Sequence, residues 1–116
     1  MESFLNIKNK IVESKKILIT SHVNPDGDAI GAGLALLAGI EKFNNKCEVR
    51  FVLQDKTPDR VKFLELERRA EMYDSNEKYD IDLAICVDSA ALSRIGDVEN
   101  AIKNIFTINI DHHISN

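Results

Sequence analysis

Short apolar segments of strand length alternate along this chain with segments of helical character, and that alternation restricts the folds open to it. Five segments have strand character: 16–21, 47–53, 70–74, 82–88 and 105–111. Four have helical character: 3–14, 28–43, Thr57 to about Arg68, and 97–103. Strands that are apolar on both faces belong to parallel sheets with helices on either side. The sequence therefore predicts an α/β fold in which helices flank a parallel five-stranded sheet.

The helix predicted over 28–43 contains a stretch, 29–40, without a charged residue. A helix that is apolar all round is buried on more than one face. We expect one side to pack on the sheet and the other on the N-terminal helix or on a second subunit, which would make the protein a homodimer. Gly33 and Gly39 are expected to serve tight packing there.

Length and composition are those of one globular domain. The chain has 116 residues, 44% of them hydrophobic and 29% charged. Its net charge of −4 gives no basic footprint for duplex nucleic acid. Cys47 and Cys86 fall in apolar segments and are typical of small core residues in a reducing compartment. With no signal peptide and no apolar stretch long enough to span a bilayer, the sequence predicts a cytoplasmic protein without membrane association.

Polar side chains follow three of the predicted strands at the point where each strand ends. The first strand runs into Ser21, His22, Asn24, Asp26, Gly27 and Asp28, the fourth into Asp88, and the last into Asp111, His112 and His113. The carboxyl ends of parallel strands share one edge, where ligands bind. We therefore expect four carboxylates and three imidazoles to converge there.

Such a set of acids cannot stay charged together without compensation: neighbouring carboxylates raise one another's pKa, or a cation neutralises them. A mixture of oxygen and imidazole ligands suits Mn²⁺, Zn²⁺ or Fe²⁺ better than Ca²⁺ or Mg²⁺. The ligands are too many for one tetrahedral ion, so two metals that share a carboxylate are the simplest arrangement. Asp88 is the natural bridge, because it is expected to stand between the other two clusters.

Each cluster also has a simpler interpretation. Asp26 or Asp28 could cap the helix that follows, Asp88 could do the same, and the two histidines could lie at the surface. These interpretations must all hold at once to explain three clusters at one edge. A dinucleotide-binding turn is a further alternative, suggested by Gly31 and Gly33, but both glycines fall inside a predicted helix instead of directly after a strand.

Three segments, "SHVNPDGDAIGAGLAL", "VDSA" and "DHHISN", resemble in order and spacing the motifs of the DHH phosphoesterases. That family includes RecJ-like exonucleases, nano-RNases with pAp phosphatase activity, cyclic-di-AMP phosphodiesterases and family II inorganic pyrophosphatases. The segment "HVNPDGDAIGA" is most similar to the nano-RNase/pAp phosphatase branch. The resemblance implies a Rossmann-like DHH domain and a hydrolase that acts on short oligoribonucleotides, pAp or cyclic dinucleotides.

The resemblance also implies a role for each motif residue. His22 and Asp26 would bind a first metal, Asp28 and His112 a second, and Asp88 would bridge the two. His113 would contact the substrate phosphate, Asp111 would orient a histidine, and Asn24 and Gly27 would support the loop. His113, Asp88 and Asp111 are thus the expected catalytic residues. Manganese is the usual metal of the family, with Mg²⁺, Zn²⁺ and Fe²⁺ as the other candidates, and two ions would activate the attacking water.

The chain departs from the family pattern after Asn116, where the sequence ends. A fourth-motif aspartate and the DHH-associated domain (DHHA1), which supplies much of the substrate site, do not follow. We therefore expect residues 1–116 to be the N-terminal part of a longer enzyme, truncated after the last strand, with little or no activity alone. The main alternative is a non-catalytic metal- or nucleotide-binding module, and a purely structural α/β domain comes third.

Overall fold

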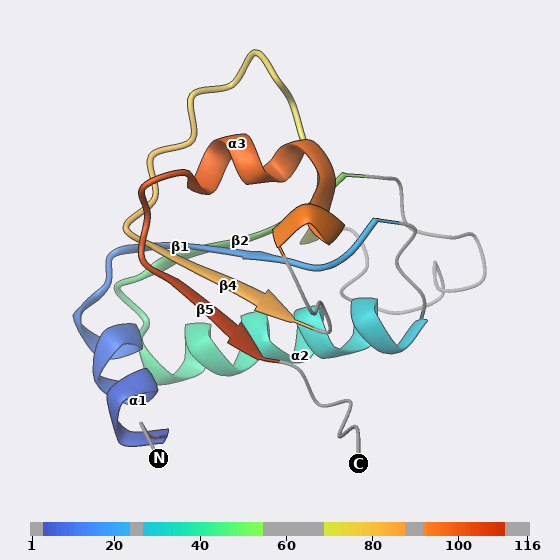
Figure 1. Ribbon diagram of the computed structural model, residues 1–116. Helices are drawn as coiled ribbons and strands as arrows, with labels where there is room; N and C mark the ends of the chain where they lie inside the picture. Colours follow the sequence, from blue (N-terminus) through green and yellow to red (C-terminus); the bar gives the residue numbers. More distant parts are fainter. Residues whose placement is uncertain (1–3, 24–26, 55–68, 88–91, 111–116) are drawn as a thin grey trace.

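A parallel five-stranded sheet forms the centre of the computed structural model, which describes residues 4–23, 27–54, 69–87 and 92–110 (Figure 1). The strands are β1 (Lys16–Thr20), β2 (Glu48–Leu53), β3 (Ala70–Met72), β4 (Leu83–Val87) and β5 (Thr107–Ile110). Their order is β3-β2-β1-β4-β5, and every pair is parallel. The predicted α/β fold is therefore confirmed. The helix expected from Thr57 to about Arg68 lies outside the described residues.

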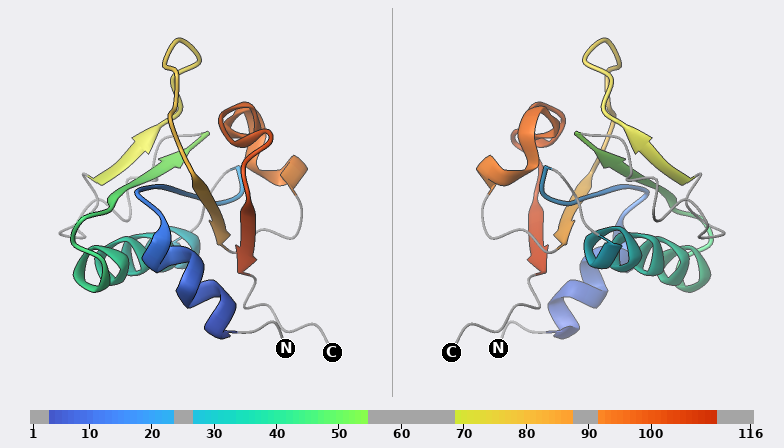
Figure 2. Two further views of the ribbon diagram at one scale, coloured as in Figure 1. Left: turned by 90° about the vertical axis from the view of Figure 1, so that its left-hand side faces the viewer. Right: turned by 90° about the vertical axis from the view of Figure 1, so that its right-hand side faces the viewer.

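Helical layers cover both faces of the sheet (Figure 2). The helices α1 (Phe4–Glu13) and α2 (Gly27–Phe43) lie on one face, and the 3-10 helix η3 (Leu92–Val98) and the short helix α3 (Glu99–Ile102) lie on the other. None of the described helices is long and apolar enough to cross a membrane.

Successive residues of each central strand point into two different cores. In β1, Ile17 and Ile19 pack with Phe51 of β2 and with α2, whereas Leu18 packs with the layer of η3 and α3. All three β1 residues are completely buried. This double burial explains why the strands are continuously apolar instead of alternating with polar residues.

The helix α2 is buried on the face toward the sheet and only partly covered on the other. Ile30, Leu34 and Leu37 pack into the core beneath the sheet. Ala35, Ala38 and Gly39 are exposed, and α1 covers only part of the outer face, leaving an apolar groove of about 410 Å³ between α1 and α2. Packing on the sheet is therefore confirmed, packing on the N-terminal helix is partial, and packing on a second subunit stays a prediction.

The helix glycines differ in what surrounds them. A Cβ added at Gly33 would overlap the ring of Phe51, so this glycine lets α2 approach β2 closely. A Cβ added at Gly39 would have no atom of the described residues within 4 Å. The tight-packing interpretation is confirmed for Gly33 and is wrong for Gly39.

Alanine substitutions at these two glycines should change stability in opposite directions. Gly33→Ala should lower the free energy of unfolding by about 1–3 kcal/mol, because the Phe51 ring must move. Gly39→Ala should raise it by about 0.5–1 kcal/mol, because alanine favours an open helix position. Urea denaturation followed by circular dichroism measures both. Equal stabilisation by the two substitutions would contradict the packing described for Gly33.

Candidate metal centre

The strands that lead into the predicted metal ligands are neighbours, and their ends are in register. Thr20 of β1 pairs with Cys86 of β4, and Cys86 pairs with Asn109 of β5. His22, Asp88 and Asp111 each come two residues after one member of this row in the sequence. Adjacent strands lie about 4.8 Å apart. The pairing therefore delivers the three segments to one short stretch of the sheet edge.

The strand that leads into Asp88 lies between the other two, because β4 separates β1 from β5. The order of strands also reverses direction between β1 and β4. Such a reversal is a topological switch point, the position where open α/β sheets bind ligands at the carboxyl ends of their strands. The helix α2 begins at Gly27, just after β1, so its N-terminus lies at the same edge (Figure 1).

The described residues include only part of the predicted site. His22 is described in full, and Gly27 and Asp28 form the start of α2. The other predicted site residues lie outside the described residues: Asn24, Asp26, Asp88, Asp111, His112 and His113. Within the described ranges, no three His, Cys, Asp or Glu side chains gather in a way that could hold a metal. The ligand assignments therefore stay predictions.

One ring nitrogen of His22 is fixed by the backbone. The ring is half-buried, and Nδ1 lies 2.7 Å from the backbone oxygen of Val23. A carbonyl accepts only, so Nδ1 donates in this contact. Metal-binding histidines are commonly fixed in this way, with one ring nitrogen donating to a carbonyl. The chemistry of His22 therefore fits a divalent metal.

Two contacts that the sequence analysis missed anchor the backbone at this edge. The buried hydroxyl of Ser21 donates a hydrogen bond of 2.7 Å to the carbonyl of Val87. Oε1 of Gln54, directly after β2, accepts a hydrogen bond of 2.6 Å from the backbone N–H of Asp97. Gly96 has a φ of 71°, and the Gln54 side chain packs where its Cβ would be. The sequence signal for this anchor was a glycine within a segment of mixed polarity, between Ile95 and Asp97.

Comparisons with known proteins agree with this geometry. The family model described as "DHH family, N-terminal domain" matches residues 16–116. The bifunctional oligoribonuclease and PAP phosphatase NrnA of Thermus thermophilus is 36% identical over 102 residues, which are 86% of this chain and 28% of that protein. An exopolyphosphatase-related protein from Bacteroides fragilis has a crystal structure that superposes with a TM-score of 0.82 at 28% identity, covering 95% of this chain and 34% of that one. The chain thus spans about a third of these relatives or less.

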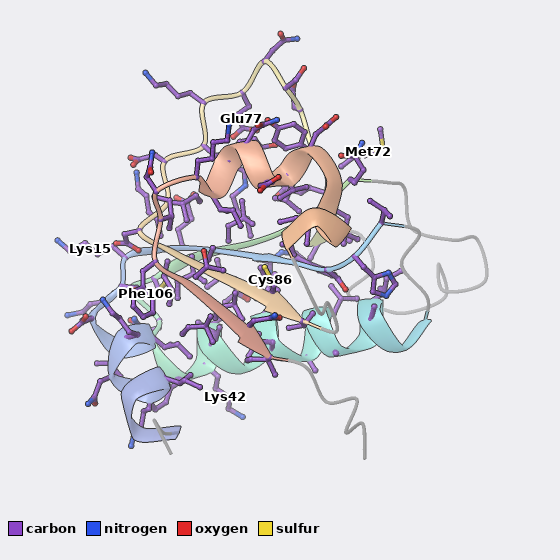
Figure 3. All side chains as sticks on the ribbon, in the orientation of Figure 1. Lys15, Lys42, Met72, Glu77, Cys86 and Phe106 are labelled. Atoms are coloured by element: carbon purple, nitrogen blue, oxygen red, sulfur yellow. The ribbon has the colours of Figure 1, made fainter. Side chains whose placement is uncertain are left out.

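Cys86 lies next to the candidate site but is not suited to bind a metal. Its side chain lies on the face of β4 that η3 and α3 cover (Figure 3), and only 2% of it is exposed. Burial raises the pKa of the thiol to about 11. The neutral thiol is a poor ligand, because metals bind the thiolate. Cys86 is therefore a core residue, as the sequence indicated, whereas Cys47 is only half-buried.

The two thiols should differ in reactivity in the native protein. At about pH 8 only about one Cys86 in a thousand is a thiolate, given its pKa of about 11. We expect iodoacetamide to modify Cys47 first and Cys86 only after unfolding in urea, as peptide mass spectrometry would show. Modification of both thiols at the same rate in the native protein would contradict the burial of Cys86.

Proposed function

This chain belongs to the DHH family, and from that premise we propose that it forms the metal-binding part of a divalent-metal-dependent phosphoesterase. The alignment of three strand ends in one row is the observation that supports this proposal most. In the proposed site, His22 and Asp26 would hold one Mn²⁺ ion, Asp28 and His112 would hold a second, and Asp88 would be shared by both. The position of β4 between β1 and β5 supports Asp88 as the bridge.

The residues of the chain would hold and orient the phosphate group. When bound, two divalent ions supply an activated water and neutralise charge on the phosphoryl oxygens. The N-terminus of α2 offers backbone N–H groups and the positive end of the helix dipole at the same edge. His113 donates to the phosphate, and Asp111 orients a neighbouring histidine. Asn24 and Gly27 support the turn between β1 and α2.

The substrate we propose is a short oligoribonucleotide or a nucleotide such as pAp. The name of the Thermus relative, an oligoribonuclease and PAP phosphatase, supports this class over a cyclic dinucleotide. The net charge of the chain supports a small substrate. A chain with a net charge of −4 offers no broad basic surface that could bind the phosphates of a long nucleic acid. The free thiols of Cys47 and Cys86 fit the reducing cytoplasm, where we place the protein. A homodimer stays a prediction.

A non-catalytic metal-binding module is the second candidate. The chain covers only 28% of the length of the Thermus relative, so most of that protein has no counterpart in the comparison. Binding of a divalent metal would distinguish the phosphoesterase and the non-catalytic module from a purely structural domain. Turnover of a phosphate ester would then distinguish the phosphoesterase from the non-catalytic module.

Mn²⁺ binding should depend on Asp88 and not on a matched aspartate at the other end of the same strand. Asp82 accepts hydrogen bonds from the backbone N–H groups of Lys15 and Lys16 at the opposite edge of the sheet. Asp88→Asn removes a charged ligand and should weaken Mn²⁺ binding by more than about 100-fold. Asp82→Asn should leave the affinity unchanged. Isothermal titration calorimetry measures both, and unchanged Mn²⁺ affinity in Asp88→Asn would contradict the proposed site.

Catalysis should require both the metal and segments that the Thermus relative has and these 116 residues do not. We expect the 116 residues alone to release little phosphate from pAp, and a chain that spans the length of the Thermus relative to turn over pAp and short oligoribonucleotides with Mn²⁺. EDTA should abolish the turnover, and added Mn²⁺ should restore it. Phosphate release and gel analysis of labelled RNA measure these activities. Turnover that survives EDTA would contradict a metal-dependent mechanism.

A further inference from the structure

We propose that Ser21 is a positioning residue for the metal centre, because its hydroxyl fixes the ends of β1 and β4 that lead into His22 and Asp88. This inference rests on the proposed function and adds a residue to which no role in the site was assigned above. Ser21 does not bind the metal in this proposal. It acts through the backbone of β4.

The bond from Ser21 joins two residues that each directly precede a proposed ligand. Ser21 is followed in the sequence by His22, and Val87 is followed by Asp88. The hydroxyl of Ser21 donates to the Val87 carbonyl at 2.7 Å, and the two residues are 66 positions apart. One short hydrogen bond therefore sets the separation of the two strand ends just before the ligands.

This bond lies where the backbone pairing between β1 and β4 stops. The last paired row of these strands is Thr20 with Cys86. Beyond it, the side chain of Ser21 extends the connection by one further residue on each strand. Among the described residues, this is the link between β1 and β4 that lies beyond their last paired row.

Burial makes the bond both strong and specific. Ser21 is completely buried, and Val87 is 4% exposed, so water does not readily replace the hydroxyl as the donor. A buried polar group that loses its partner carries the full cost of desolvation. The polar hydroxyl at this buried position is thus matched to the Val87 carbonyl.

A second anchor lies on the far side of the Asp88 segment. Gln54 holds the N–H of Asp97, and the neighbouring Ile95 and Val98 are completely buried in the core against η3. The described residues on either side of the Asp88 segment in the sequence are thus held by Ser21, through Val87, and by Gln54, through Asp97. Of these two anchors, Ser21 is the one adjacent to both proposed ligands.

Ser14 provides a matched control, because it is a buried serine at the other end of the same strand. Its hydroxyl donates to the backbone oxygen of Lys10 at 2.5 Å, and it is 7% exposed. Ser14→Ala and Ser21→Ala each remove one buried hydroxyl bond. A purely structural role for Ser21 predicts the same consequences for both substitutions.

The test compares Ser21→Ala, Ser14→Ala and Ser21→Thr in the 116-residue chain by Mn²⁺ calorimetry and by thermal unfolding with and without Mn²⁺. Both alanine variants should lower the metal-free Tm by a similar amount, about 4–8 °C. Only Ser21→Ala should also weaken Mn²⁺ binding, by about 10–100-fold, and lose most of the Mn²⁺-induced rise in Tm. Ser21→Thr keeps the hydroxyl donor and should restore binding.

Three results of this test would contradict the positioning role of Ser21, and one of them would also contradict the proposed function. Unchanged Mn²⁺ affinity in Ser21→Ala contradicts the positioning role while leaving the proposed function intact. If Ser14→Ala loses as much Mn²⁺ affinity as Ser21→Ala, the loss reflects lower stability in general, which also contradicts the positioning role. No Mn²⁺ binding by the unsubstituted chain contradicts the proposed function itself, and the positioning role with it. Ser21→Cys, which keeps the side-chain volume but is a weaker donor, gives the same comparison if Ser21→Ala does not fold.

Discussion

The parallel pairing of β1 with β4 is the constraint on which the rest of this structure depends. It places two strands that are distant in the sequence side by side, in a register fixed by the row of Thr20 and Cys86. A shift of this register by one residue would turn every side chain of β1 to the opposite face, and Ile17 and Ile19 would leave their core. The hydrophobic packing of the strands therefore also fixes where the proposed ligands emerge.

Stability and function are separated along the strands of this domain. The middle of each central strand is apolar on both faces and holds the two cores together. The acids and histidines of the proposed metal site follow the carboxyl ends of these strands in the sequence. At the opposite edge, Asp82 accepts hydrogen bonds from the backbone N–H groups of Lys15 and Lys16, so a carboxylate there has a structural partner in the protein.

Much of this fold could be predicted from the sequence, because the strands are apolar and short while the helices between them have clear spacing. The parallel arrangement of the three strands that precede the polar clusters was expected from the sequence and is confirmed, whereas the convergence of the clusters themselves stays a prediction. The bond between Ser21 and Val87 could not be predicted, since no local pattern links residues 66 positions apart. The difference between Gly33 and Gly39 was also hidden, because it depends on where the ring of Phe51 lies. That α1 covers only part of the outer face of α2 could not be predicted, because the small residues on that face carry little apolar surface to bury.

The central claim is that three strand ends build one metal centre, and paramagnetic broadening by Mn²⁺ in two-dimensional NMR spectra of the chain tests it most directly. Broadening reports distance from the ion. We predict that substoichiometric Mn²⁺ broadens the amide signals at the carboxyl ends of β1, β4 and β5 together, including His22, Val87 and Ile110. The signals of Asp82 and Lys16, at the opposite edge, should stay sharp. Broadening confined to one strand end, or centred elsewhere on the molecule, would contradict the account.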